Sequence, residues 1–267
     1  MLWSARSKCP NLVVVPPNYD LYMKASNALF EMIQGFSPKV QRFSVDEMFL
    51  DYTGLEPHFG EPVAAANYFR EKIKRELGFT VNIGVSTNKL LAKMAGELKK
   101  PDLVHTIWPE EVPEKMWPLP VEELFMVGRR TAPKLKAMGI YTIGDLAGAD
   151  IVRLTRRLKS FGYVVSAYAR GMDDSPVQVG RYVEVKGMGN STTMKFDVTE
   201  GEVACKMLLS LTETVCMRLR SAASCCSVIS VEFRGSDLNF YSHQKRISPP
   251  TNVTNEIFMA IRQLFYE

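Results

Sequence analysis

The sequence predicts an α+β protein in which a unit of strands and helices is followed by a small all-helical unit and a second α+β unit. Strand-like and helix-like segments alternate over about the first hundred residues. Short apolar stretches separated by Gly128, Gly139 and Gly144 then follow, which is typical of short helices. The last stretch has the order β-α-β-β-α, one strand short of a split βαβ layout.

The first unit is predicted to start with a short buried strand, because the apolar run NLVVV at residues 11–15 is stopped by two prolines. Residues 19–33 are predicted to form a helix, since their apolar side chains recur at helical spacing. The segment VQRFSVDEMFLDYTGL at residues 40–55 is predicted to form strands that break around Asp46 and Glu47.

Three more elements complete this unit. Residues 62–77 are predicted to form a helix closed by Gly78, and residues 79–86 a strand. A further helix is predicted over residues 87–100, where Thr87 and Asn88 supply a cap and Pro101 follows.

The remaining elements follow from the same patterns. Residues from Pro109 onward are predicted to be a small helical unit, and residues 180–186 an extended polar connector. The last unit is predicted to contain a strand near residues 186–198, a helix over 201–219, strands over 228–233 and 239–248, and a helix over 255–267.

The composition is that of a soluble globular protein, with 46% hydrophobic and 23% charged residues among 267. No apolar run approaches the roughly 20 residues needed to span a bilayer, and the first ten residues lack the apolar core of a signal peptide. We therefore expect an intracellular protein. The five cysteines form no CxxC pair, and we expect them to be small buried residues in a reducing compartment.

Positive charge is concentrated in one part of the chain. Residues 126–171 contain nine Lys/Arg against two Asp/Glu, a surplus of +7 that exceeds the net charge of +4 of the whole chain. Such a local excess suits a polyanion such as a nucleic-acid backbone. A solvated charged face explains the same excess equally well.

Asp46 and Glu47 stand out because they lie within an otherwise apolar segment. Burying carboxylates among apolar side chains is unfavourable unless a cation neutralises them, and magnesium held beside substrate phosphates is a natural partner. Neighbouring residues on a regular strand face opposite ways, so joint ligation needs a bend. The alternative is an ion pair with Arg42 or a turn cap, and the dipeptide alone favours that alternative.

The string FSVDEMFLD resembles the acidic palm motif of Y-family DNA polymerases, the UmuC/DinB-like (impB/mucB/samB) group. Four other strings resemble the same family in the same order: CPNLVVVPPNYDLY, GVSTNKLLAKMA with KKPD, LPVEELFMVGRRT, and GIYTIGDLA. The resemblance covers nearly the whole chain, and several motifs in one order are far more specific than any of them alone.

The resemblance implies a partial, ferredoxin-like palm with helices, a small all-α thumb with a helix-hairpin-helix, and a ferredoxin-like little finger. The implied boundaries are the end of the fingers at 1–16, an incomplete palm at 17–109, the thumb at 110–179, a linker at 180–186 and the little finger at 187–267. The last strand of the little finger is expected to be missing.

By the same resemblance, Asp46 and Glu47 would be two of the three metal-binding carboxylates, and the complete site would hold two Mg²⁺ ions. The third carboxylate of the family lies on its first palm strand, beside the steric-gate aromatic residue, and nothing in this sequence matches that motif. The expectation is a polypeptide truncated at its N-terminus and at its C-terminus that does not polymerise by itself.

Other functional residues are implied by position in the family motifs. Lys100 would bind the triphosphate, although a positive charge at a helix C-terminus explains it as well. Lys93 would contact DNA or be merely solvated. The helix-hairpin-helix would bind a phosphate through Gly128, Arg129, Arg130 and Lys134, with a plain helical bundle as the alternative. Weaker DNA-binding candidates in the little finger are residues 190–193, His243, Lys245 and Arg246.

The implied function is template-directed DNA synthesis past damage, as in bacterial DNA repair and the SOS response. Its partners would be primer–template DNA, deoxynucleoside triphosphates and a sliding clamp or activator protein, in the cytoplasm near the nucleoid and without a membrane. One alternative is a non-catalytic DNA-binding fragment or accessory protein that holds primer–template. Another is a different two-metal enzyme such as a nucleotide cyclase, which the basic hairpin argues against.

Overall fold

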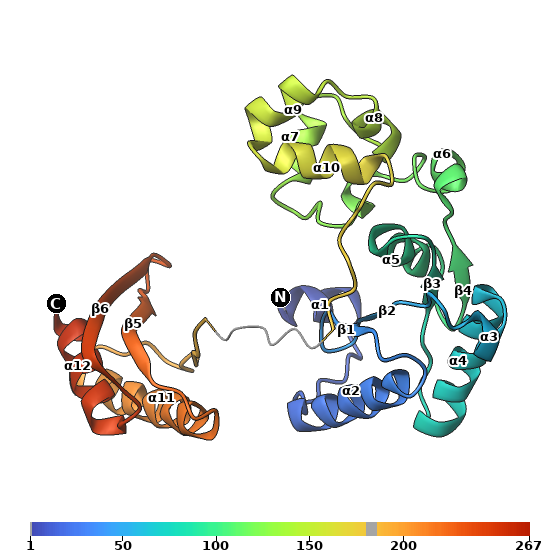
Figure 1. Ribbon diagram of the computed structural model, residues 1–267. Helices are drawn as coiled ribbons and strands as arrows, with labels where there is room; N and C mark the ends of the chain where they lie inside the picture. Colours follow the sequence, from blue (N-terminus) through green and yellow to red (C-terminus); the bar gives the residue numbers. More distant parts are fainter. Residues whose placement is uncertain (1, 180–185) are drawn as a thin grey trace. The chain divides into compact units, whose positions relative to one another are not determined.

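The computed structural model describes residues 2–179 and 186–267, which belong to two compact units, 1–181 and 182–267 (Figure 1). Of the predicted connector at residues 180–186, only Lys186 lies within the described residues. No described helix is long and apolar enough to cross a membrane.

The first unit begins with helix α1 (Leu2–Lys8) and an irregular segment that leads to α2. The predicted buried strand in this segment is wrong, because residues 11–15 form no strand and Val13 and Val15 are 81% and 74% exposed. A strand needs a neighbour to satisfy its backbone groups, and no strand of the described chain pairs with this run.

Helix α2 (Tyr19–Gln34) forms where its apolar spacing predicted it, and the side chain of Asn18 caps it by accepting from the Leu21 N–H at 3.1 Å. Strands β1 (Val40–Arg42) and β2 (Met48–Leu50) then pair antiparallel, with Val40 opposite Leu50. The predicted break between two strands around the acidic pair is therefore confirmed.

Helices α3 (Glu56–Phe59) and α4 (Pro62–Leu77) follow, and α4 ends at Gly78 as predicted, with that glycine in the left-handed conformation. The ring of Phe36 stacks on that of Phe69 in α4 at 4.0 Å between centroids, and it also meets Phe59 of α3 edge-on. This aromatic cluster holds α3 and α4 against the end of α2.

Strands β3 (Ile83–Val85) and β4 (Val104–Thr106) pair in parallel, and helix α5 (Lys89–Glu97) connects them. Asn88 caps α5 by accepting from the Leu91 N–H at 2.8 Å, as predicted, although α5 ends three residues before Lys100. The first unit thus contains two two-stranded sheets in its described part.

The chain then forms a run of short helices, as predicted. They are η1 (Pro109–Glu111), α6 (Val112–Lys115), η2 (Val121–Glu123), α7 (Ala132–Lys136), α8 (Ile143–Ala147), α9 (Ile151–Leu158) and α10 (Phe161–Ala169). One hydrophobic core joins these helices to α5, since Leu91 of α5 is buried in the same cluster as Leu135 and Leu154. Burial of α5 against this core fixes the helix that carries Lys93.

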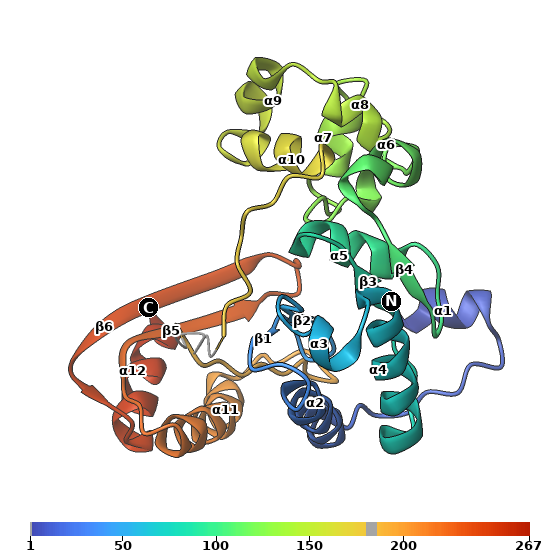
Figure 2. The same cartoon turned by 45° about the vertical axis from the view of Figure 1, so that its right-hand side comes forward.

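The second unit consists of α11 (Gly201–Ser221), β5 (Cys226–Arg234), β6 (Phe240–Thr251) and α12 (Thr254–Tyr266). The two strands form a long antiparallel hairpin, and Figure 2 shows both helices beside it. The strand predicted near residues 186–198 is wrong, because this segment is irregular throughout. Its glycines at 187 and 189 and its short polar run disfavour a strand.

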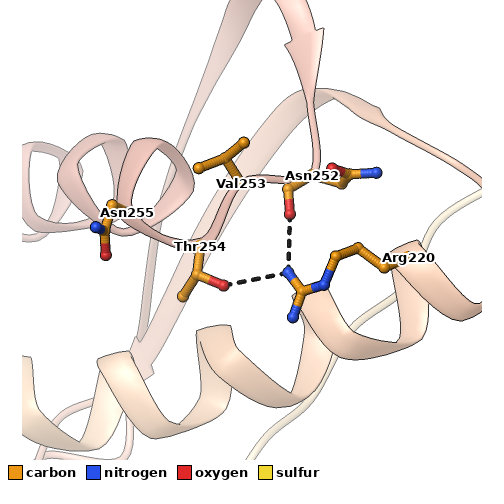
Figure 3. Close-up of a pocket in the computed structure, with 5 residues that line it drawn as sticks. All are labelled: Arg220, Asn252, Val253, Thr254 and Asn255. Atoms are coloured by element: carbon orange, nitrogen blue, oxygen red, sulfur yellow. Dashed lines mark hydrogen bonds between the residues drawn. The ribbon is translucent and has the colours of Figure 1, made fainter.

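A shallow pocket in the second unit lies where β6 turns into α12 (Figure 3). Arg220 of α11 donates from Nη1 to the carbonyl oxygen of Asn252 at 3.1 Å and to Oγ1 of Thr254 at 3.3 Å. These bonds tie α11 to the turn, and none of the family-derived catalytic, triphosphate or thumb residues lies in this unit.

The cysteines are all free thiols, and their burial matches the expectation only in part. Cys205 and Cys216 are buried on one face of α11, as their spacing of three helical turns predicts. Cys9 and Cys225 are exposed, so for them the expectation of burial is wrong.

Candidate functional site

Asp46 and Glu47 lie in the turn that joins β1 to β2. The N–H groups of Phe43 and Ser44 both donate to the carbonyl oxygen of Glu47, at 2.9 and 3.1 Å, which closes the hairpin. The Ser44 hydroxyl donates to Oδ1 of Asp46 at 2.7 Å and lies 3.5 Å from Oε2 of Glu47. The Ser44 hydroxyl therefore contacts both carboxylates. The bend in the chain that would let both acids bind one cation is present at this turn.

Ser44 has no role assigned from sequence, although it stands in the FSVDE string. A serine two residues before an aspartate is a common local hydrogen-bonding pattern in turns, which is the signal that points to it.

The cation that meets the acidic turn is Lys93 of α5, which forms an ion pair with Glu47. The side chains of Lys93 and Glu47 are 19% and 34% exposed, so the pair is partly shielded from water. Burial alone would lower the pKa of Lys93, but hydrogen bonds to Glu47 and Glu97 outweigh it and raise that pKa above its ordinary value.

Arg42, the partner considered from sequence, is engaged elsewhere. Its Nη1 donates to Oδ1 of Asn27 at 2.9 Å, and its guanidinium lies 4.5 Å from the centroid of the Phe30 ring. The sequence offered a turn or an ion pair with Arg42 as the alternative to a metal site. The turn is present, whereas the structure shows no ion pair between Arg42 and the two acids.

Asp51, the third acid of the FSVDEMFLD string, is separately bonded. Its Oδ2 pairs with Lys39 at 3.2 Å, and its Oδ1 accepts from the Thr53 N–H at 3.0 Å. Burial raises the pKa of Asp51, but the bonds from Thr53 and Lys39 outweigh it and hold the pKa below its usual range. Within residues 2–179 and 186–267, no three His, Cys, Asp or Glu side chains form a metal-binding group.

The donor set of the acidic turn nevertheless suits a magnesium ion. Two adjacent carboxylates and one hydroxyl are hard oxygen ligands, and magnesium in proteins is commonly bound by one or two carboxylates together with water and substrate phosphates. The residues present therefore fit part of a divalent-cation site.

Lys100 is exposed and stands in a loop that is firmly anchored after α5. The Asn82 side chain donates to the carbonyl oxygen of Lys99 at 2.6 Å, and Asp102 pairs with Lys74 at 2.6 Å and Arg70 at 2.7 Å. The hydrogen bonds from Lys74 and then Arg70 lower the pKa of Asp102. Lys100 itself pairs with Oε2 of Glu97 at 2.7 Å.

The thumb hairpin places its unusual backbone at Met126 rather than at Gly128. Met126 is 56% exposed and adopts φ 71°, a left-handed conformation that favours glycine. Gly128 has no such φ, and a Cβ added there would meet nothing within 4 Å. The hairpin therefore forms with methionine in a backbone conformation that favours glycine.

The hairpin presents both N–H groups and cations to solvent. In the part of the chain that the structure describes, the N–H groups of residues 128–130 donate to no backbone or side-chain acceptor. The side chains of Arg129, Arg130 and Lys134 are exposed. This arrangement can bind a phosphate by backbone and charge without distinguishing bases.

Most of the basic surplus of residues 126–171 is unneutralised. Lys136 pairs with Glu122 at 2.6 Å, and it is the one Lys or Arg of that range with a carboxylate partner among the described residues. Exposed basic side chains without such a partner are Arg129, Arg130, Lys134, Arg153, Arg156, Arg157, Lys159 and Arg170.

The weaker candidates of the second unit do not share one face. Lys245 donates to Oε1 of Gln263 in α12 at 2.8 Å, and His243 stands opposite the buried Val231. Both positions are therefore on the helix-covered side of the hairpin. Arg246 stands opposite the exposed Val228, on the other side.

Three family models match the chain. The model of the impB/mucB/samB family matches residues 1–97, that of the IMS family HHH motif matches residues 109–140, and that of the impB/mucB/samB family C-terminal domain matches residues 185–267.

Curated relatives match along the whole chain. DNA polymerase IV of Clostridium acetobutylicum is 45% identical over 100% of this chain and 67% of its own length. DNA polymerase IV of Acetivibrio thermocellus is 38% identical over 99% of this chain and 66% of its own length. DNA polymerase IV 1 of Bacillus subtilis is 34% identical over 100% of this chain and 64% of its own length. The chain thus spans about two thirds of the length of these relatives.

Solved structures share the fold. A Y-family DNA polymerase chimera of Dbh and Dpo4 superimposes with a TM-score of 0.81 at 20% identity, over 99% of this chain and 75% of that one. DinB from Sulfolobus solfataricus matches with a TM-score of 0.60 at 20% identity, over 99% and 76%. With its ordered motifs, its acidic hairpin turn and its basic helical hairpin, the chain belongs to the impB/mucB/samB family, the Y-family of DNA-directed DNA polymerases.

Proposed function

We propose that this chain supplies the palm carboxylate pair, the thumb and the little finger of a translesion-type polymerase, which performs template-directed DNA synthesis past damage. The observation that carries the proposal is the hairpin turn in which Ser44 gathers Asp46 and Glu47. The names of the relatives, DNA polymerase IV, support the assignment of DNA and deoxynucleoside triphosphates as substrates.

In this proposal Asp46 and Glu47 hold divalent cations, and two Mg²⁺ ions in the complete site would activate the attacking hydroxyl and stabilise the leaving phosphate. Ser44 orients the two carboxylates through its hydroxyl. Lys100 offers a flexible cation to the triphosphate from an anchored loop.

The thumb hairpin would hold the duplex by its phosphates. Its unbonded N–H groups and exposed arginines support binding that is independent of sequence, which a polymerase needs in order to move along any template. The same features support the second candidate function, in which the polypeptide by itself only holds primer–template DNA.

We further propose that the 267-residue polypeptide does not extend a primer by itself, because its described residues bring no third acid to Asp46 and Glu47. A primer-extension assay compares this chain with a chimera in which the chain replaces the residues that it matches in DNA polymerase IV of Clostridium acetobutylicum. We expect extension by the chimera only. Extension by the 267-residue chain alone would overturn the proposed incompetence, and none by the chimera would overturn the polymerase proposal.

DNA binding tests the thumb separately. The double variant Arg129→Ala, Arg130→Ala is expected to weaken binding to a labelled primer–template, and to flatten the plot of log Kd against log salt by about 2. The measurement is fluorescence anisotropy at several salt concentrations. Lys136→Ala is the matched control, since Lys136 already pairs with Glu122 and should alter the slope little. An unchanged slope in the double variant would show that these arginines do not meet phosphates.

A further inference from the structure

Lys93 stands between two carboxylates. Its Nζ pairs with Glu47 of the acidic turn, and with Oε1 of Glu97 one helical turn further along α5 at 2.7 Å. Only 19% of the Lys93 side chain is exposed, whereas its partners are 34% and 46% exposed, so water screens these pairs in part. The ammonium group is thus the resident cation at Glu47 in this chain.

Glu97 connects Lys93 to Lys100. Its second oxygen, Oε2, pairs with Lys100 at 2.7 Å. The four side chains form a row of alternating charge from Glu47 through Lys93 and Glu97 to Lys100. Because Lys93 and Glu97 lie at i and i+4 of one helix, their pair can persist when Glu47 takes another partner.

We propose that Lys93 is a positioning residue that competes with the divalent cation for Glu47, and that Glu97 retains Lys93 when the cation binds. The inference rests on the proposed role of Asp46 and Glu47 as cation ligands. Before the cation arrives, Lys93 offsets the repulsion between the two adjacent carboxylates. Once the divalent cation is bound, the Lys93 ammonium beside it is unfavourable unless a second carboxylate compensates the ammonium charge. Glu97 already pairs with Lys93 and can supply that charge.

Lys89 provides a matched comparison on the same helix. It lies one turn before Lys93 and donates to Oε1 of Gln41 at 3.2 Å and to the carbonyl oxygen of Pro176 at 2.9 Å. Both partners are uncharged. Removing the charge of Lys89 changes the local electrostatic potential without freeing a carboxylate.

The test is a titration of the 267-residue chain with Mn²⁺, followed by paramagnetic broadening of the backbone amide NMR signals of residues 44–48. Lys93→Met is expected to bind Mn²⁺ about fivefold more tightly, the size of one partly exposed ion pair. Lys93→Arg keeps the charge and should restore the wild-type affinity, whereas Lys89→Met should leave it within about twofold. Lys93→Gln replaces Lys93→Met if methionine prevents folding.

A double-mutant cycle separates competition from general electrostatics. Glu97→Gln should weaken Mn²⁺ binding in the wild-type background, because Glu47 is then the one carboxylate left to pair with Lys93. The same substitution should have no effect when Lys93 is methionine. Equal weakening in both backgrounds, or an unchanged affinity of Lys93→Met, would overturn the proposal. The absence of broadening at residues 44–48 in every variant would instead overturn the assignment of Asp46 and Glu47 as cation ligands.

Discussion

Replacing Gly84 by alanine is expected to destabilise the first unit by at least about 3 kcal/mol. A Cβ built on Gly84 would lie 1.8 Å from the carbonyl oxygen of Ala92 and 2.5 Å from the backbone nitrogen of Gly96. Both atoms belong to the backbone of α5, so no side-chain rotation can relieve the contact. The helix would have to move away from β3.

Moving α5 disturbs two other parts of the first unit. Leu90 and Leu91 are at most 1% exposed and lie in the core shared with the thumb helices, so a displaced α5 leaves cavities there. Lys93 would also move relative to Glu47, because Lys93 lies on α5 whereas Glu47 lies in the turn between β1 and β2.

Urea denaturation followed by tryptophan fluorescence measures this effect in one unit, since Trp3, Trp108 and Trp117 all lie before residue 181. Gly128→Ala is the control, because a Cβ there meets nothing within 4 Å and the expected change is below about 1 kcal/mol. A Gly84→Ala midpoint equal to that of the unaltered chain would contradict the close approach of β3 and α5.

Asp46→Asn and Glu47→Gln are each expected to lower primer extension by the chimera with the Clostridium acetobutylicum relative on the order of a thousandfold or more. Each amide keeps the shape of the side chain but loses the charge that holds a divalent cation. DNA affinity should change little, because the basic hairpin of the thumb lies on a different segment. The measurement is single-turnover incorporation of one nucleotide, with anisotropy on the same primer–template.

Asp51→Asn is the control for general effects of charge in this motif. Asp51 bonds to Lys39 and to the Thr53 N–H, apart from the acidic turn, so extension should stay within about tenfold of the unaltered protein. Full activity in Asp46→Asn would exclude this carboxylate from the cation site. A loss in Asp51→Asn as large as that in Asp46→Asn would show that the assay reports folding rather than ligation.

Sequence patterns predicted elements well where neighbouring residues decide the structure. The strand break at Asp46 and Glu47, the Asn88 cap of α5 and the end of α4 at Gly78 are all local, and each is confirmed. The apolar run at residues 11–15 was predicted wrongly, because hydrophobic side chains show that a segment can be buried but not that a partner strand is present.

The residues of the candidate site likewise fall into those that the sequence predicted and those that only the structure shows. The carboxylate pair was predicted from its motif, whereas Ser44 as the residue that gathers the two acids follows from the geometry of the turn. The hairpin glycine position is another case, since Met126 adopts a left-handed φ that residue preferences assign to glycine. The surrounding buried residues, such as Leu124 and Val127, hold that backbone in place.

The sequence by itself determined the family and, to within two residues, the bounds of the long helices α2, α4, α11 and α12, because ordered motifs and local caps depend on residues close together in the chain. Only the tertiary structure decided which cation meets the acidic turn. Lys93 lies 46 residues from Glu47, and Arg42, only five positions before Glu47, is held by Asn27 instead. The core that buries α5 against the thumb helices fixes the helix that carries Lys93, and no local pattern encodes the contact of Lys93 with Glu47.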